Sequence, residues 1–421
     1  GAAPGDEARV RIVKDCKRYA FGILDEVLTP SPDRIPVDCA VAGPCGGCSL
    51  RHLDYAAELR AKQENVADAF ARIGGLDVPV LPIVGSPEVN RYRNKVQFPV
   101  GVDKSGKPCI GFYAGRTHRI VPCPDCRLQP GVLNEIGNAL CAFFAEKGIQ
   151  PYSEETGRGL VRHIFLRRGA HSGQIMVCLV CTRAKLPSAE ELCTRLKAQF
   201  AEITTILLNV NAKNTNVILG TETHTLYGQG YIEDTLCGVP VQLGPLSFYQ
   251  VNTLAAEQLY GIAAQYAQLT PDDLLLDLYC GMGTIGLSMA AHCRELIGVE
   301  IVPEAIESAK ANAARMGADV AAKSRFFCAD AGQAATRLAA EGLHPDIVML
   351  DPPRKGCDEA TLSAVVRMAP RRVVYVSCNP ATAARDAAWL EQNGYHAEKV
   401  QPVDLFPRTR HCECVLSLSK V

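Results

Sequence analysis

A single thiol, Cys378, occupies a position in the sequence where catalytic side chains are often found. The residues before it, 371–377, are rich in β-branched and aromatic types and predict a buried strand, which Asn379-Pro380 ends. In open α/β sheets, ligands bind at the carboxyl ends of the strands. A structural cysteine more often packs inside a strand as a small hydrophobic residue. Position alone therefore leaves a catalytic nucleophile and a structural thiol equally open.

A glycine-rich turn predicts a nucleotide cofactor. A predicted strand at 274–279 leads into the pattern G-x-G-x-x-G at 281–286, which opens a helix. Glu300 then ends a second strand, where its carboxylate can accept hydrogen bonds from ribose hydroxyls. The spacing also satisfies the dinucleotide fingerprint, so NAD remains an alternative. Carboxylates near the turn, Asp277 and Asp330, would repel a pyrophosphate but suit a sulfonium and an amine, and we therefore favour S-adenosylmethionine over NAD.

Two further carboxylates are placed to act beside that cofactor. Asp351 ends a predicted strand at 346–351, and two prolines then fix an extended turn that could hold the polar edge of a substrate. The alternative role of Asp351 is to cap the following segment. Glu413 lies in the predicted last strand, 411–418, on the same face as His411. By itself, Glu413 would pass for an ordinary surface acid.

A group of cysteines near the N-terminus suggests a metal or cluster site. Cys39, Cys45 and Cys48 fall within ten residues, with two glycines that let the backbone fold tightly, and Cys123 and Cys126 follow about eighty residues later. A zinc site with four cysteine ligands usually has two CxxC pairs. Three ligands plus one distant ligand is a pattern common for a [4Fe–4S] cluster. Spacing alone does not settle the metal.

A basic and aromatic segment precedes the glycine turn. Between residues 91 and 119, seven lysines and arginines stand against one acid, Asp103, and aromatic side chains are interleaved with them. A protein that reads structured RNA needs charge for phosphates and rings for unstacked bases. The alternative is a solvated β-hairpin face. The net charge of the whole chain is −1, which argues against a protein that coats nucleic acid non-specifically.

The composition indicates a globular cytoplasmic protein. A chain of 421 residues is too long for one ordinary core, so two or three domains are expected. The sequence has no apolar run long enough to span a membrane and no signal-peptide pattern. Its nineteen cysteines are scattered and odd in number, which favours reduced thiols over a secreted disulfide framework.

The order of the predicted elements divides the chain into three parts. Two strands within 8–28 predict the end of a small OB-like β-barrel, and a helix is predicted over 52–73. From residue 246 strands and helices alternate, which is typical of a doubly wound parallel sheet. The predicted domains are a partial barrel at 1–38, a central α+β RNA-binding domain at 39–245 and a Rossmann-like α/β domain at 246–421.

Together these motifs resemble the bacterial RNA uridine C5-methyltransferases, most closely the 23S rRNA type with an N-terminal TRAM domain and an iron–sulfur cluster. The resemblance covers nearly the whole chain. Its motifs are Cys39-x5-Cys45-Gly-Gly-Cys48, Tyr92-Arg-Asn-Lys95, Ser247-Phe-Tyr-Gln-Val-Asn252, Asp277-Leu-Tyr-Cys-Gly-Met-Gly-Thr284, Asp351-Pro-Pro-Arg354, Ser377-Cys-Asn-Pro380 and His411-x-Glu413. Two features depart from the family pattern: the barrel begins partway through, and Cys123 is an additional thiol.

The resemblance implies S-adenosylmethionine-dependent methylation of C5 of one uridine in 23S rRNA, by a monomer that needs no membrane. Cys378 would add to C6 of the uracil as the nucleophile, Glu413 would remove the C5 proton, and Asp351 would hydrogen-bond near the reacting centre. The implied cofactor and uracil pocket comprises Gln250, Tyr279, Thr284, Glu300, Asp330 and Asp351. The implied [4Fe–4S] ligands are Cys39, Cys45, Cys48 and Cys126, and the expected RNA contacts are Arg91, Tyr92, Arg93, Lys95 and Phe248.

Other functions remain open at the level of sequence. The same covalent chemistry would serve a tRNA uridine or a cytosine methyltransferase. A catalytically silent RNA-binding protein on a methyltransferase fold is an alternative of a different class. The presence of Cys378, Glu413 and Gln250 in one chain argues against the silent protein.

Overall fold

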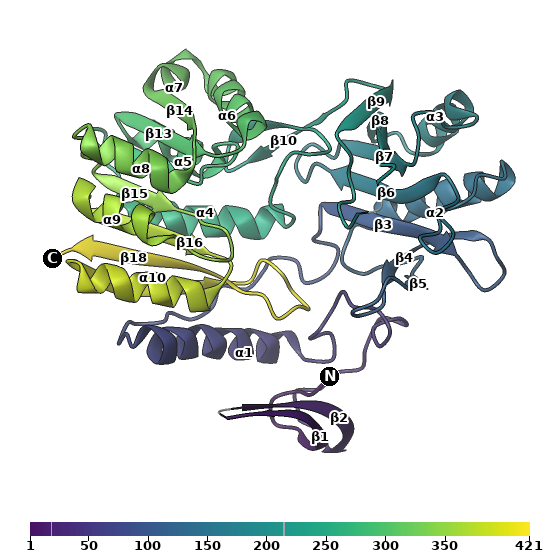
Figure 1. Ribbon diagram of the computed structural model, residues 1–421, viewed down its shortest axis with the longest axis horizontal. Helices are drawn as coiled ribbons and strands as arrows, with labels where there is room; N and C mark the ends of the chain where they lie inside the picture. The colour runs from purple at the N-terminus through teal and green to yellow at the C-terminus, as the bar shows by residue number, and fades with distance from the viewer. Residues whose placement is uncertain (18, 214) are drawn as a thin grey trace.

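The computed structural model describes residues 1–17, 19–213 and 215–421, and it contains two seven-stranded sheets (Figure 1). The strands of the C-terminal sheet are β12 (Leu274–Leu278), β13 (Glu295–Glu300), β14 (Ser324–Cys328), β15 (Ile347–Leu350), β16 (Arg372–Ser377), β17 (Tyr395–Val403) and β18 (Glu413–Lys420). Their order is β14-β13-β12-β15-β16-β18-β17, and all run parallel except β18, which is antiparallel to both neighbours. This topology confirms the expected Rossmann-like fold.

Helices cover both faces of this sheet. They are α1 (Tyr55–Asp68), α4 (Thr253–Ala267), α5 (Thr284–Met289), α6 (Pro303–Met316), α7 (Ala318–Lys323), α8 (Ala331–Ala340), α9 (Glu359–Met368) and α10 (Pro380–Gln392), with a short 3-10 turn, η2 (Ala290–His292), after α5. One core lies between the sheet and α4, α5 and α6, and the other between the sheet and α1, α8, α9 and α10. Along β16, Val374 faces the first core and Tyr375 the second, because strand side chains alternate. No helix in the described ranges is both long and apolar enough to cross a membrane.

The central sheet is mostly antiparallel and has its own core. Its strands are β3 (Lys95–Val102), β4 (Pro108–Tyr113), β5 (Ile120–Pro122), β6 (Val161–Arg168), β7 (Ile175–Cys181), β8 (Ile203–Val210) and β9 (Glu222–Tyr227). Their order is β5-β4-β3-β6-β7-β8-β9. Helices α2 (Gly131–Glu146) and α3 (Ala189–Gln199) cover one face of this sheet. A separate hairpin, β10 (Ile232–Leu236) and β11 (Val239–Leu243), packs against α4 and α6 of the C-terminal part.

The N-terminal residues form a two-stranded antiparallel ribbon. Strand β1 (Glu7–Cys16) pairs with β2 (Tyr19–Thr29). Within the described ranges these strands pair with each other alone, so the structure has two strands of the expected barrel and no closed barrel. Apolar side chains on the ribbon, such as Ile12 and Phe21, are more than half exposed. The assignment to a TRAM domain stays a prediction.

A helical segment that precedes the central sheet in sequence packs on the C-terminal sheet. Helix α1 continues into a π-helical turn, η1 (Ala69–Gly74), which packs against α10; α1 lies beside α10 in Figure 1. Lys62 of α1 is 1% exposed, and its Nζ donates to Glu58 at 2.7 Å and to Asp404 at 2.8 Å. Residues 55–84 therefore share a core with the C-terminal sheet, although they fall within the predicted central domain, 39–245.

Candidate active site

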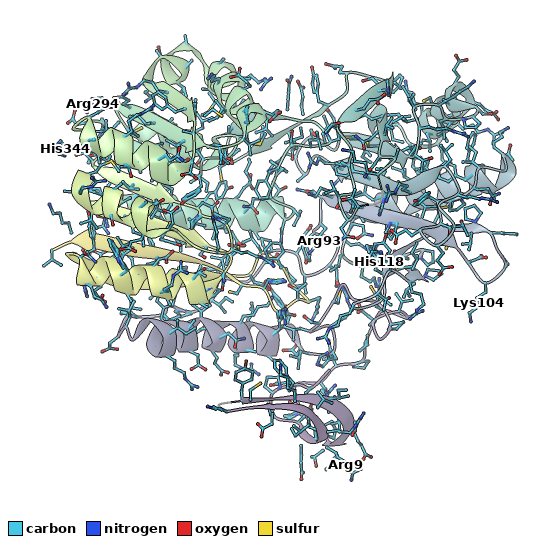
Figure 2. The ribbon with its side chains drawn as sticks, in the orientation of Figure 1. Arg9, Arg93, Lys104, His118, Arg294 and His344 are labelled. Carbon is cyan, nitrogen blue, oxygen red and sulfur yellow. The ribbon has the colours of Figure 1, made fainter. Side chains whose placement is uncertain are left out.

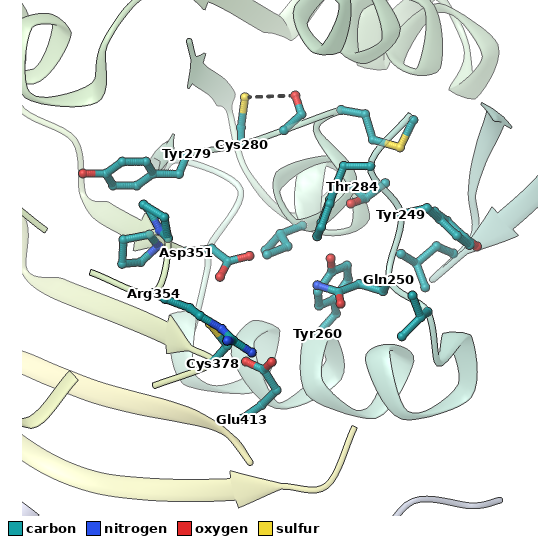
Figure 3. A pocket seen from close by; sticks show the side chains of 18 of the residues that line it. Tyr249, Gln250, Tyr260, Tyr279, Cys280, Thr284, Asp351, Arg354, Cys378 and Glu413 are labelled. Carbon is teal, nitrogen blue, oxygen red and sulfur yellow. Dashed lines mark hydrogen bonds between the residues drawn. The ribbon is translucent and has the colours of Figure 1, made fainter. Parts of the chain in front are cut away.

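A cavity of about 520 Å³ lies at the carboxyl ends of β12, β15 and β16, where the central sheet approaches the C-terminal sheet. Figure 3 shows side chains from these strands and from α4 converging on it. Because the parallel strands all end at this edge, residues far apart in sequence meet there. The expected site residues in its lining are Cys378, Glu413, Asp351, Gln250, Tyr279, Thr284, Arg93, Lys95 and Phe248.

The predicted nucleophile and base lie on adjacent strands. Cys378 follows β16 directly, and Glu413 is the first residue of β18, whose pairing of Cys414 with Ser377 aligns the two strand ends. Cys378 is half-buried, whereas Glu413 is 6% exposed. Burial, with the charge of Asp351, raises the pKa of Glu413 to about 8, and burial raises the pKa of Asp351 to about 7. Both carboxyl groups can therefore exchange a proton near neutral pH.

Arg354 brings positive charge to these acidic groups. Its side chain extends past Cys378 toward Glu413 (Figure 3). Burial, Glu413 and Asp351 raise the pKa of the Cys378 thiol, while the charge and hydrogen bond of Arg354 oppose that rise. Arg354 therefore partly offsets the groups that disfavour the thiolate of Cys378. The sequence reasoning read this arginine as part of a turn and did not assign it to the site.

The glycine turn after β12 is built over a buried carboxyl group. Asp277 is 1% exposed, and its Oδ2 accepts a hydrogen bond from Gly286 N at 3.0 Å. Its Oδ1 is buried and has no hydrogen-bond partner among the described residues, and burial raises the pKa of Asp277 to about 8. A Cβ on Gly286 would come within 2.8 Å of this carboxylate, so the third glycine is needed for close packing. Asp277 thus supports the turn from beneath and does not lie at its mouth, as the sequence had suggested.

The turn itself exposes backbone to the cavity. Tyr279 has a φ of 67°, in the left-handed region that non-glycine residues seldom adopt, and its hydroxyl lies 3.4 Å from Thr361 Oγ1. Gly281, with a φ of 55°, lines the cavity, and a Cβ there would meet no atom within 4 Å. The backbone at Gly281 is therefore open to a ligand that approaches closely.

Glu300 and Asp330 lie outside the lining of the cavity. The Glu300 carboxylate accepts hydrogen bonds from Gly281 N at 3.2 Å and from the N–H groups of the two residues that follow it at 2.8 and 3.0 Å. Asp330 caps α8, and its Oδ1 accepts from Gln333 N at 3.1 Å. In this structure both carboxylates fix backbone, and their predicted contacts with a cofactor stay predictions.

Sequence reasoning missed two residues that shape the wall beside Gln250. Tyr260 of α4 is 4% exposed and lies next to Gln250 and Thr284, and burial raises its pKa. An aromatic residue in an apolar helix cannot be told from a core residue by pattern alone. Asn94 Nδ2 donates to the carbonyl oxygen of Gln250 at 2.7 Å and to Thr253 Oγ1 at 3.0 Å. This amide ties the start of β3 to the segment that carries Gln250.

Three of the expected RNA-binding residues face the cavity. Arg93 lies between the two sheets (Figure 2), and Lys95 lines the cavity beside it. Burial and the nearby cations Arg167 and Arg93 lower the pKa of Lys95 to about 8. Phe248 is 74% exposed at the same cavity, where its ring is free for stacking.

The other two expected RNA contacts, Arg91 and Tyr92, are engaged inside the protein. Arg91 Nη1 donates to the carbonyl oxygen of Cys126 at 2.7 Å, and its Nη2 pairs with Asp125 at 2.8 Å. Tyr92 is 5% exposed, and its hydroxyl donates to the carbonyl oxygen of Pro407 at 2.9 Å. Both side chains therefore stabilise the protein itself. Their contact with RNA stays a prediction.

The predicted cluster ligands gather in a separate small pocket. Cys39, Cys45, Cys48 and Cys126 line it together with Cys123. All nineteen cysteines of the chain are free thiols. Within the ranges that the structure describes, no three histidine, cysteine, aspartate or glutamate side chains form an arrangement able to hold a metal ion. The cysteines therefore converge, and the cluster itself stays a prediction.

Comparisons with known proteins relate the whole chain to RNA methyltransferases. The family described as tRNA (uracil-5-)-methyltransferase matches residues 169–421. An uncharacterized RNA methyltransferase of Bacillus cereus is 42% identical over 99% of this chain and 90% of its own length. A second, from Clostridium tetani, is 42% identical over 100% of this chain and 90% of its own length.

The same similarity extends to a solved structure. The tRNA (uracil-54, C5)-methyltransferase of Pyrococcus abyssi, in complex with S-adenosyl-L-homocysteine, superimposes with a TM-score of 0.78. It is 27% identical in sequence, and the match covers 99% of this chain and 94% of the Pyrococcus chain. The similarity therefore includes both sheets and the cavity between them.

Proposed function

Since the chain belongs to the tRNA (uracil-5-)-methyltransferase family, we propose that it methylates C5 of one uridine in 23S rRNA through a covalent bond between Cys378 and C6 of the uracil. The observation that carries this proposal is the shared cavity, in which Cys378, Glu413 and the glycine turn line one space. S-adenosylmethionine, the methyl donor of this family, accounts for the glycine turn.

The residues at the turn fit S-adenosylmethionine. Gly281 leaves backbone open to the cavity, and Gln250, Tyr279 and Thr284 present polar groups beside it. Glu300, whose carboxylate accepts a hydrogen bond from Gly281 N, places negative charge beside the turn, which suits a cationic ligand and disfavours a pyrophosphate. When bound, S-adenosylmethionine supplies an electrophilic methyl group attached to a sulfonium.

Cys378 activates the uracil in this proposal. Its thiolate adds to C6, and the electron pair of the C5–C6 double bond makes C5 nucleophilic, as an enolate is. Arg354 favours the thiolate through its charge and hydrogen bond. Asp351, at the same wall, can hydrogen-bond the polar edge of the uracil.

Glu413 completes the reaction as the base. After C5 has gained the methyl group, the Glu413 carboxylate removes the C5 proton, the C5–C6 double bond forms again, and Cys378 leaves as a thiolate. The burial of Glu413 supports this role, because a carboxylate with a pKa of about 8 is a stronger base than an exposed one.

The substrate proposal rests on the cysteine pattern. Three clustered cysteines and one distant cysteine characterise the 23S rRNA enzymes that the sequence resembles, and all four line one pocket. The second candidate is a tRNA uridine, which is favoured by the 27% identity to the Pyrococcus tRNA (uracil-54, C5)-methyltransferase. Arg93, Lys95 and Phe248 would serve either RNA, since charge and stacking carry little sequence information.

Methyl transfer from labelled S-adenosylmethionine tests the proposal directly. Unmodified 23S rRNA and tRNA transcripts would be incubated with the enzyme, and the modified base would be mapped. We expect label at C5 of one rRNA uridine and no label with Cys378→Ala. Label in tRNA alone would favour the second candidate. No label in either RNA, with the cofactor still bound, would contradict the enzyme assignment.

We also propose that Cys39, Cys45, Cys48 and Cys126 hold a [4Fe–4S] cluster, which takes four thiolate ligands. Iron and acid-labile sulfide would be measured after anaerobic purification. We expect four of each per chain, and their loss in Cys48→Ser. Cys328→Ser, at an exposed thiol away from this pocket, is the matched control. Protein without iron under these conditions would remove the cluster.

Free thiols throughout the chain support a reducing compartment, and we propose a monomer in the cytoplasm. Light scattering on the purified protein measures the oligomeric state. A mass near 45.4 kDa is the expected result, and twice that mass would contradict it.

A further inference from the structure

A second cavity adjoins the wall that carries Cys378. It has a volume of about 570 Å³ and shares Arg354, Cys378 and His411 with the catalytic cavity. Its remaining walls are the end of α1, η1, the start of α10 and residues 410–412, and we call this cavity the outer groove. Because Cys378 belongs to both cavities, a polymer with one residue beside the thiol can continue into the outer groove.

The outer groove carries an excess of positive charge. Its charged residues are Arg72, Arg354 and Arg410 against Asp68, and Asp68 pairs with Arg72 at 3.2 Å. Arg410 is exposed and has neither a hydrogen bond nor an ion pair from its side chain within the ranges described. Burial, together with Arg354 and Arg410, lowers the pKa of His411. The groove therefore complements an anion and would repel a cation.

The floor of the groove is apolar and held in place. Ile73 is 57% exposed in η1 and lines the groove, as does Pro380 at the start of α10. Helix α10 packs so closely on η1 that a Cβ on Gly74 would come within 3.0 Å of the carbonyl oxygen of Ala384. Single π-helical turns of this kind occur frequently at functional sites. A rigid apolar floor beside basic side chains matches the base and the phosphate of a nucleotide.

We propose that the outer groove binds the nucleotide next to the target uridine in the RNA strand, with its phosphate at Arg410 and Arg354 and its base on Ile73 and Pro380. The inference rests on the proposed function, because it requires the target base to lie at Cys378. A volume of about 570 Å³ suits one nucleotide, since pockets of a few hundred cubic ångströms hold ligands of that size. The groove thus holds the neighbour of the uridine, while the catalytic cavity holds the uridine itself.

Steady-state kinetics on Arg410→Ala test the phosphate contact. We expect the KM for RNA to rise about tenfold at 0.15 M salt, with kcat within about twofold of the wild type, because the contact positions the strand and takes no part in bond making. The slope of log affinity against log salt should fall by about one. The control is Arg337→Ala on α8, an exposed arginine with a loose pair to Glu341, and it should leave both quantities unchanged.

Photo-crosslinking locates the neighbouring base independently of kinetics. An RNA with 4-thiouridine on one side of the target uridine should crosslink to residues 65–73 or 379–381, and Ile73→Glu should reduce the yield. An unchanged KM and salt slope in Arg410→Ala, in an enzyme that methylates RNA normally, would overturn the groove alone. A crosslink to another surface would do the same. A wild-type enzyme that methylates no RNA would overturn the proposed function, and the groove would fall with it.

Discussion

Arg354 faces a thiol and two carboxyl groups, and burial favours the neutral form of each of the three. Burial raises the pKa of Cys378, Asp351 and Glu413, and the negative charge of each carboxylate raises the pKa of the thiol further. Arg354 lowers the pKa of both Cys378 and Glu413, so it favours the two charged forms that the proposed reaction uses. Burial therefore opposes the charged forms of Cys378 and Glu413, and one cation at the edge of the site partly offsets it.

Substitutions of the two reacting groups should have different consequences. Cys378→Ala removes the group that activates the uracil, so neither methyl transfer nor an enzyme–RNA adduct should be detectable. Glu413→Gln should still form the adduct but release it about 10²–10⁴-fold more slowly, because a base is missing. Denaturing gels with labelled RNA measure the adduct. Glu307→Gln, at an exposed acid on α6, should behave as wild type, and a Glu413→Gln enzyme that turns over normally would refute the assignment.

The pKa of Glu413 predicts the pH dependence of this reaction. With a pKa of about 8, about one tenth of the carboxyl is charged at pH 7 and about half at pH 8. The single-turnover rate should therefore rise about fivefold over this interval. The pKa of Cys378 is also raised, so its thiolate fraction increases with pH in the same direction. Arg354→Gln should move the rise to higher pH, because Arg354 lowers both pKa values. A flat profile from pH 6.5 to 8.5 would contradict the prediction.

The sequence predicts the position of a site residue well where that residue lies at the end of a strand. Cys378, Asp351 and Glu300 follow or end buried parallel strands, and periodicity together with chain breaks located those ends closely. Tyr260 could not be predicted, because it lies inside a helix whose pattern is that of core. Asp277 was placed at the mouth of the turn, since sequence gives the strand end and not the face of the strand to which its last side chains point.

The glycine turn gives a prediction on stability. The pKa of Asp277 is about 8 in the folded protein, against 3.8 for the free side chain. The folded state therefore binds this proton more tightly, and the associated stability is present below about pH 4 and lost as pH rises through about 8. Asp277→Asn keeps an oxygen that can accept from Gly286 N and carries no charge. At pH 8.5 we expect the free energy of unfolding of Asp277→Asn to exceed that of the wild type by an amount of the order of a few kcal/mol. Thermal unfolding measures this as a higher melting temperature.

The comparison at pH 6 tests the size of this effect. At that pH the carboxyl is protonated in the folded state and charged in the unfolded state, so the advantage of Asp277→Asn should be smaller than at pH 8.5 but still present. Glu413→Gln should show the same sign of effect, since burial raises the pKa of Glu413 as well. An Asp277→Asn protein that is less stable than the wild type at pH 8.5 would show that the carboxylate is needed in its charged form.

At the scale of the whole molecule, the two sheets form one body around the cavity. Phe165, Met176 and Leu207 of the central sheet lie in the same hydrophobic core as α4, α5 and α6. Lys95 from one sheet and Cys378 from the other are consequently held across a fixed gap. The sequence pattern separated the two sheets at residue 246, but the hydrophobicity of a strand does not tell which element covers it. The shared core was therefore visible only in the structure.

A buried charge cluster joins α1 to the C-terminal sheet. Lys62 Nζ donates to Glu58, to Asp404 and, at 3.2 Å, to the carbonyl oxygen of Phe406, whose ring lines the catalytic cavity. No pattern in the sequence indicates this contact, because Lys62 and Asp404 are 342 residues apart. The cluster thus connects the packing of α1 with the position of residues at the site.

Lys62→Met should destabilise the protein by about 3–5 kcal/mol, because it leaves Asp404 buried without its cation and leaves Glu58 with the longer ion pair to Arg408, at 3.6 Å. Urea unfolding followed by the fluorescence of Trp389, the single tryptophan, reports on α10, which packs against η1. Lys310→Met removes an exposed lysine on α6 and should cost about 0–1 kcal/mol. Adding Glu58→Gln and Asp404→Asn to Lys62→Met should restore part of the loss, since the unpaired charges are then gone. Equal shifts for Lys62→Met and Lys310→Met would mean that α1 docks through its apolar contacts alone.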